Sequence, residues 1–223
     1  LHRRQRQMCI RDRYYNQQCS IAEAYDISIN NKGLRELPRP RIRLSREEMV
    51  FGKKLVDEVK EKTKKDKVLV FQPFGRTVHH ENGMISDYSG RSFEAENAVA
   101  IVKKLSKKFG VIHMAEFGID FNKHEVKEPV ASPMGASLRH WAGIIASADY
   151  FLGCDSLGQH MAKALGTTCT SVIGSTYPIN ISYPNSPDFD IIDLGEGKRK
   201  FSPIRLTMAV SYTHLRAHET STY

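Results

Sequence analysis

The sequence predicts an α/β fold in which a Rossmann-like parallel sheet is flanked by helices. Short apolar runs recur along the chain, such as "KVLVFQPFG" at 67–75 and "VIHMAEF" at 111–117. Continuous apolar runs of this kind are typical of strands that are buried on both faces of a parallel sheet. Amphipathic stretches of helical length separate these runs, and strands that alternate with helices form βαβ units.

The first expected helix begins after Ser45, which opens an S-x-x-E capping box with Glu48. Its apolar spacing extends over about 15 residues. A second helix is expected over 92–110 with Ser92 as its N-cap, because acidic residues come early and lysines late, as the helix dipole favours. Ser137 is the expected N-cap of a third helix. The remaining elements are a helix at 156–166 and strands at 149–154, 169–175 and 189–195.

Both ends of the chain resemble translated DNA adapter. Residues 8–13 and 209–215 back-translate to strings that are reverse complements of one another. A natural gene has no reason to carry both strands of one short element at its two ends. We therefore expect 1–13 and 209–223 to be adapter-derived. The chain is then a fragment, in which 14–44 form a linker with the remnant of a preceding domain, and 45–208 form the Rossmann-like domain.

The charge of the chain is modest once these ends are set aside. The formal net charge is +8, of which 1–13 carry +4 (five Arg and one Asp) and 209–223 carry zero, which leaves +4. Many of the remaining basic residues alternate with acidic or apolar residues, as on solvated helix faces. No nucleic-acid partner is expected, and a modest positive field suits a phosphorylated ligand.

Cysteine use and hydropathy bear on the location of the protein. Outside the adapter, Cys19, Cys154 and Cys169 show no paired spacing, which favours a reduced, cytoplasmic setting. No apolar run approaches the roughly 20 residues that a transmembrane helix needs. We expect no transmembrane segment, and peripheral membrane contact stays open.

The candidate site lies in "FLGCDSLGQHMAKALG", residues 151–166. A strand ends there and a helix begins, and in open α/β sheets ligands bind beyond the carboxyl ends of the strands. Asp155 or Ser156 is placed to cap the helix, Gly158 would let a phosphate approach the backbone, and His160 would add a hydrogen bond or a charge. The alternative is a pair of ordinary N-cap residues and a surface histidine.

The motifs from 138 to 178 carry a family resemblance. "DYFLGCDSLGQHMAKALGTT", followed by "IGSTYP", resembles the donor-binding half of the family 9 glycosyltransferases, the heptosyltransferase-like enzymes. Upstream, "SGRSFEAENAVAIVKKL" resembles the basic and aromatic segment of that family, with Arg91 at the basic position. The resemblance extends over about 38–203. Two departures are Leu157 in place of the family glycine and a "QPFG" turn that lacks the usual histidine.

The resemblance implies the C-terminal half of a GT-B fold and an inverting transfer that needs neither metal nor cofactor. The implied donor is a nucleotide-diphosphate sugar, and the implied acceptor is a lipopolysaccharide-type glycan or a lipid-linked one. Since the catalytic base of the family lies in the preceding domain, this chain is not expected to catalyse transfer alone. The implied donor-binding residues are Arg91 at the diphosphate, Asp155, Ser156, Gly158 and His160 at the diphosphate or ribose, and Ser175 and Thr176 at the border of the cleft.

Two patterns suggest metal ligands. "DFD" at 188–190 matches the Asp-x-Asp of metal-dependent glycosyltransferases, but its alternation with the following isoleucines fits the entrance of a strand. "VHHE" at 78–81 lacks the spacing of a zinc site and favours a mobile loop over the cleft. We expect no metal.

Two other functions remain open from the sequence. One is another GT-B enzyme, such as a nucleotide-sugar 2-epimerase, which would need additional acid–base carboxylates in the cleft. The other is a nucleotide-binding module that kept the fold and lost the reaction, because fold alone does not determine function.

Overall fold

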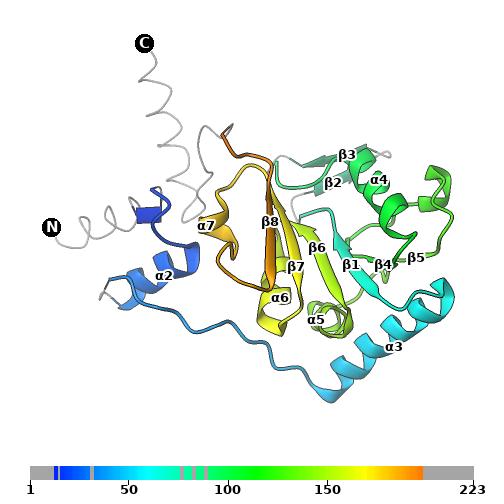
Figure 1. Ribbon diagram of the computed structural model, residues 1–223, viewed down its shortest axis with the longest axis horizontal. Coiled ribbons are helices and arrows are strands. Elements are labelled where there is room, and N and C mark those ends of the chain that lie inside the picture. Colours follow the sequence, from blue (N-terminus) through cyan, green and yellow to red (C-terminus); the bar gives the residue numbers. More distant parts are fainter. Residues whose placement is uncertain are drawn as a thin grey trace, which may run out of the picture. The chain divides into compact units, whose positions relative to one another are not determined.

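The computed structural model describes residues 13–14, 16–30, 33–75, 78–81, 84–87 and 90–197 (Figure 1). They belong to two compact units. The larger unit comprises 39–173 and 184–192, and the other comprises the described parts of 13–38, 174–183 and 193–197. The expected adapter segments, Arg13 excepted, lie outside the described residues, and the expected domain boundary at 44/45 stays a prediction.

A six-stranded parallel sheet organises the larger unit, in the order β5-β4-β1-β6-β7-β8. In chain order this is 3-2-1-4-5-6, the Rossmann arrangement, so the predicted fold class is confirmed. The order reverses between β1 and β6, which pair in parallel with Leu69 opposite Tyr150. The strands are β1 (Val68–Gln72), β4 (Gly110–His113), β5 (Val130–Ala131), β6 (Tyr150–Cys154), β7 (Cys169–Ile173) and β8 (Phe189–Asp193).

Helices cover both faces of the sheet (Figure 1). On one face lie α3 (Arg46–Thr63), α5 (Leu138–Ser147) and α6 (Leu157–Leu165), and on the other lies α4 (Ala95–Leu105). The predicted caps of α3 and α5 are confirmed. Ser45 and Glu48 form the complete capping box of α3, and the Ser137 hydroxyl accepts the backbone N–H of His140 in α5.

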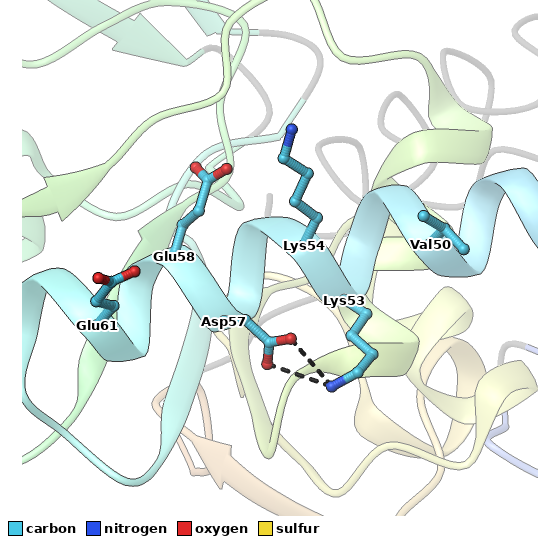
Figure 2. A pocket seen from close by; sticks show the side chains of 6 residues that line it. All are labelled: Val50, Lys53, Lys54, Asp57, Glu58 and Glu61. Atoms are coloured by element: carbon cyan, nitrogen blue, oxygen red, sulfur yellow. Dashed lines mark hydrogen bonds and ion pairs between the residues drawn. The ribbon is translucent and has the colours of Figure 1, made fainter.

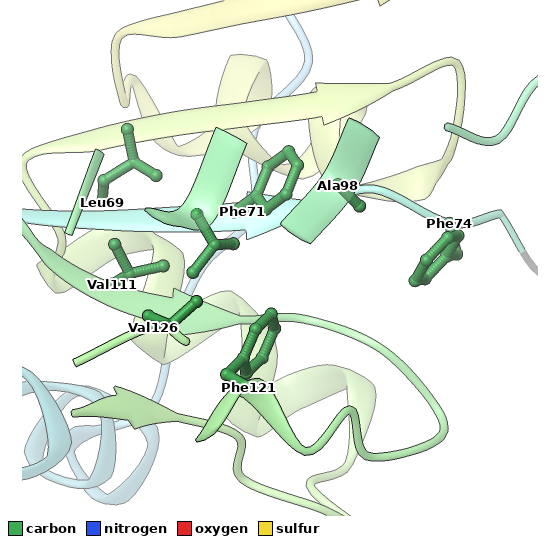
Figure 3. Close-up of a cluster of buried hydrophobic side chains, with 8 residues drawn as sticks. Leu69, Phe71, Phe74, Ala98, Val111, Phe121 and Val126 are labelled. Atoms are coloured by element: carbon green, nitrogen blue, oxygen red, sulfur yellow. The ribbon is translucent and has the colours of Figure 1, made fainter. Parts of the chain in front are cut away.

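The core on the α4 face joins side chains of β1, α4 and β4 (Figure 3). Leu69 and Phe71 point to this face because alternate residues of a strand point the same way. Phe71 meets the Phe93 ring edge-on, with ring centroids 5.6 Å apart. The buried cluster comprises Leu69, Phe71, Phe74, Ala98, Val102, Val111, Phe121 and Val126.

The start of α4 differs from the prediction. The helix begins at Ala95 with Glu94 as N-cap, so Ser92 does not cap it. The Ser92 hydroxyl instead accepts a hydrogen bond from the N–H of Gly75. Both the hydroxyl and the backbone N–H of Ser92 donate to Asp87 Oδ2. Gly75 follows β1 and Asp87 is the last residue of β3, so partners outside the helix engage the Ser92 hydroxyl.

Between β1 and α4 the chain forms a hairpin. The strands β2 (Val78–Glu81) and β3 (Met84–Asp87) pair antiparallel. The prediction of a loop at 78–81 is therefore wrong, because these residues form a strand. A short 3₁₀ helix, η1 (Phe121–His124), was also not predicted.

The other unit includes α2 (Ile21–Asn30) and α7 (Pro178–Ile181). A capping box begins α2, because Ser20 and Glu23 exchange two backbone–side-chain hydrogen bonds. The buried Asn180 amide donates to the carbonyls of Tyr14 and Cys19 at 2.9 Å each. Part of the expected linker, 14–44, is therefore folded against 178–182.

Candidate functional site

The candidate site lies at the carboxyl ends of β1, β4 and β6, where the strand order of the sheet reverses. A cavity of about 410 Å³ opens there. Such a switch point is where open α/β sheets bind ligands. Most of its lining is apolar or aromatic. The cavity is lined by Gln72, Phe74, Gly75, Val78, Met114, Ala115, Glu116, Phe117, Leu138, Trp141, Ser156 and Leu157.

The N-terminus of α6 is capped by a side chain from the end of β1. Ser156 is the N-cap residue, but its side chain makes no capping bond. The Gln72 side chain takes that role, because its Oε1 accepts the N–H of Gly158 at 3.0 Å. Its Nε2 donates to the Ser156 hydroxyl at 3.3 Å. The end of β1 and the start of α6 are thus joined by one carboxamide.

Packing explains the glycine at 158. A Cβ there would lie 2.2 Å from Cζ of Phe151 and 2.3 Å from Oε1 of Gln72. Since its N–H is bonded to Gln72, a phosphate would reach Gly158 only by displacing that amide. The expected phosphate contact at Gly158 stays a prediction.

Asp155 is nearly buried, at 5% exposure, and is held by a polar chain. Its Oδ1 accepts Nε2 of Gln159 at 3.2 Å. Oε1 of Gln159 in turn accepts the Ser171 hydroxyl at 2.9 Å. Sequence reasoning missed Gln159 and Ser171. The available signal was a glutamine four residues after Asp155 on an otherwise apolar helix face.

His160 lies one turn into α6 and is half-buried. Burial lowers its pKa, and the neighbouring Asp155 carboxylate opposes that shift. A neutral imidazole at pH 7 offers hydrogen bonds and no formal charge. Of the two roles expected for His160, the hydrogen-bonding one fits this environment.

Arg91 reaches the end of β6. Its Nη1 donates to the backbone carbonyl of Asp155 at 3.3 Å. The bonds of Ser92 to Gly75 and Asp87 fix the neighbouring backbone. The structure therefore brings Arg91, Asp155 and Ser156 to one edge of the sheet.

Ser175 and Thr176 follow β7 and belong to the unit that contains 174–183. Thr176 is 4% exposed. The Ser175 hydroxyl oxygen is buried and has no hydrogen-bond partner among the described residues. Their place at the border of the donor cleft stays a prediction.

The metal interpretation of "DFD" is weakened by the partners of Asp188. Its carboxylate pairs with Arg39 at 2.8 Å and with Lys163 at 3.1 Å. A hydrogen bond from the Ser186 hydroxyl, assisted by Lys163, lowers the pKa of Asp188 to about 2. The described part of the chain contains no group of three potential metal ligands. The side chains of 79–81 lie outside the described ones.

Two other hollows contain none of the candidate residues. One, of about 480 Å³, runs along the exposed face of α3, where Lys53 pairs with Asp57 (Figure 2). The other, of about 680 Å³, lies beside α4 and η1 and includes Lys103, which pairs with Glu125. In the second hollow Lys123 also pairs with Asp120.

Cys19, Cys154 and Cys169 are free and buried. Among the helices that the structure describes, none is both long and apolar enough to cross a membrane.

Solved structures of similar fold include two glycosyltransferases. One is the ADP-heptose LPS heptosyltransferase II of E. coli, with 17% identity, a TM-score of 0.50, and coverage of 85% of this chain and 58% of that one. The other is a family 9 glycosyltransferase of Veillonella parvula, with 13% identity, a TM-score of 0.55, and coverage of 91% and 60%. The chain thus spans less than two thirds of each. The fold that the motif resemblance implied is the fold found. No protein-family model and no curated protein sequence matches the chain.

Proposed function

We propose that this chain is the donor-binding part of a glycosyltransferase that transfers a sugar from a nucleoside diphosphate to a lipopolysaccharide-type or lipid-linked glycan. The observation that carries the proposal is the cavity at the switch point of the sheet, bordered by Ser156 and close to the end of β6 that Arg91 contacts. Because the chain spans about three fifths of the solved glycosyltransferases, the transfer is assigned to the complete enzyme.

The cavity suits a nucleoside. Phe74, Phe117 and Trp141 give it an aromatic lining for a planar base. Glu116 is exposed at its rim, and a carboxylate accepts hydrogen bonds from ribose hydroxyls. Adenine is the base to test first, since the E. coli protein of similar fold is named for ADP-heptose.

Arg91, Ser156 and His160 suit the diphosphate. Guanidinium groups bind phosphate oxygens through paired hydrogen bonds, and the start of α6 adds its helix dipole. Together they would stabilise the departing nucleoside diphosphate without a metal ion. Asp155, held by Gln159, would accept a hydroxyl of the ribose or the donor sugar. Inversion follows the resemblance to family 9 glycosyltransferases.

Thermal unfolding of the full chain with ADP, UDP, GDP and CMP, with and without EDTA, tests the proposal. A ligand that binds the folded state at a hundredfold over its Kd adds about 2.7 kcal/mol. We expect ADP to raise Tm equally with and without EDTA, and Arg91→Met to reduce the shift.

Lys62→Met is the matched control, because it also removes one positive charge, from an exposed position in the last turn of α3. It should leave the shift by ADP intact. A cooperative transition that no nucleotide moves would contradict the proposal. A shift that EDTA abolishes would contradict its metal-free part.

A further inference from the structure

We infer that Gln72 is a positioning residue that turns the Ser156 hydroxyl into a hydrogen-bond donor toward the cavity, where it meets a phosphoryl oxygen of the nucleoside diphosphate. This inference rests on the proposed function. It concerns a residue that the motif resemblance leaves without a role, since the family histidine is absent from "QPFG".

The orientation of the Gln72 amide follows from its partners. The backbone N–H of Gly158 can only donate, so the atom 3.0 Å from it is the carbonyl oxygen of the amide. The NH₂ group then faces the Ser156 hydroxyl at 3.3 Å. Because NH₂ can only donate, the Ser156 oxygen must accept.

The Ser156 hydroxyl proton is left to face a ligand. A serine hydroxyl has one proton, and the bond from Gln72 does not use it. Among the described residues, the bond from Gln72 is the one that Ser156 Oγ makes. Gln72 is 8% exposed and Ser156 half-buried, and both line the cavity.

The space beside Ser156 is open at Gly75. A Cβ on Gly75 would lie 3.8 Å from the hydroxyl oxygens of both Ser156 and Ser92, an ordinary van der Waals distance. The Ser92 hydroxyl already donates its proton to Asp87, so of these two hydroxyls Ser156 is the one that can donate to a ligand. An acceptor that carries negative charge is favoured because the Arg91 guanidinium reaches the residue before Ser156.

Gln72→Glu tests the inference with little change in shape. Near pH 8 the new carboxylate accepts from both Gly158 N–H and Ser156 O–H, so the cap of α6 remains while the hydroxyl turns away from the ligand. A lost hydrogen bond to a charged group corresponds to a roughly 10- to 100-fold weaker Kd for ADP. Calorimetric titration measures Kd, and Tm without nucleotide confirms that the variant is folded.

A double-mutant cycle with Ser156→Ala separates positioning from simple repulsion. If Gln72 acts through the hydroxyl, Gln72→Glu weakens ADP binding much less in the Ser156→Ala background than alone. Acidification supplies a second readout. A protonated carboxyl donates to Ser156 as the amide does, so the Kd of Gln72→Glu relative to the wild type recovers as pH falls through the pKa of the new carboxyl, which an NMR titration of the variant measures.

The outcomes are distinct. Coupling between the two substitutions together with recovery at low pH supports the inference. ADP binding by the wild type with additive substitutions, or with no recovery, overturns the inference and leaves the proposed function standing. If the wild type binds none of the four nucleotides, both fall together.

Discussion

Gly52 of α3 and Gly143 of α5 lie in direct backbone contact. A Cβ on Gly52 would lie 2.0 Å from the carbonyl oxygen of Gly143, and a Cβ on Gly143 would lie 2.1 Å from that of Glu48. The two helices can approach this closely because neither position has a side chain. This contact fixes α3 against the helix whose first turn, at Leu138, lines the cavity.

Gly52→Ala and Gly143→Ala should each destabilise the fold. The clash is with backbone, which cannot move aside as a side chain can, so we expect a cost of about 3 kcal/mol or more. For a domain of this size that is a fall in Tm of roughly 6–12 °C. Gly118→Ala is the control, since nothing lies within 4 Å of its Cβ position. Equal Tm values for all three variants would refute the close-contact explanation.

Arg139→Met should lower the stability of the fold above pH 4.5 and weaken its dependence on pH between 4.5 and 2. Arg139 bonds both carboxylate oxygens of Glu48 at 2.6 Å and, with the backbone of Ser45, lowers the pKa of Glu48 from 4.5 to about 2. The stability that this carboxylate contributes is present above pH 4.5 and is lost as pH falls through 2. Without Arg139 the pKa of folded Glu48 lies closer to 4.5, so this carboxylate contributes less stability above pH 4.5 and less is lost on acidification.

A carboxyl NMR titration measures the Glu48 pKa in the Arg139→Met variant, and acid unfolding gives the midpoint. Lys53→Met removes a solvent-exposed pair with Asp57 and should change neither. An unchanged Glu48 pKa in Arg139→Met would show that the ion pair is not what lowers it.

Because of His113, the fold should lose stability as pH falls from 6.5 to 4. It is 1% exposed, and burial lowers its pKa from 6.5 to about 4. In that range the unfolded chain binds a proton that the folded chain does not, so acidification costs up to about 3 kcal/mol. Urea unfolding at several pH values measures the slope.

His113→Leu should reduce that slope without abolishing it, because His160 is shifted in the same direction. His124→Leu, at an exposed position of η1, should preserve it. A slope that His113→Leu leaves intact would assign the acid sensitivity to other groups.

Gly75→Ala should weaken nucleotide binding and leave the fold intact. The added methyl group meets Ser156 and Ser92 at ordinary contact distance but occupies space in the cavity. One methyl group in a fitted pocket changes affinity by roughly 10-fold or more. Calorimetric titration should show the weaker affinity for ADP, and Tm without ligand should be unchanged. Unchanged affinity would place the ligand away from Gly75.

Gln159→Met should destabilise the fold by about 1–3 kcal/mol, because the Asp155 carboxylate and the buried Ser171 hydroxyl lose their shared partner. Chemical denaturation measures the change. Asn97→Ala, which removes an exposed amide bonded to Glu94, should be close to neutral. Equal effects of the two variants would argue against a special role for Gln159.

Local signals predicted much of the fold. Ser45 with Glu48, and Ser137, cap their helices as the sequence indicated, because each partner lies three residues away. Ser20 and Glu23 give the same signal at α2, and it was overlooked within a polar segment.

Long-range partners explain what the sequence did not reveal. Ser92 is a residue type that caps helices well, but Gly75 and Asp87 engage its hydroxyl and α4 begins only at Ala95. The candidate residues Asp155, Ser156 and Arg91 were found from motifs, whereas Gln72, Gln159 and Ser171 were not. The role of Gln72 depends on β1 lying beside β6, which only the strand order reveals. Gln159 lies four residues after Asp155, so that spacing was an available signal.

The bond between Gln72 and Ser156 also has a consequence for the order of events in folding. The two residues lie 84 positions apart, and they meet only after β6 has paired with β1. Contacts so distant along the chain form late, because the loop between them must first be closed. A chain emerging from the ribosome therefore has no cavity until its central strands have joined. A nucleotide would stabilise the finished sheet and hardly affect how quickly folding begins.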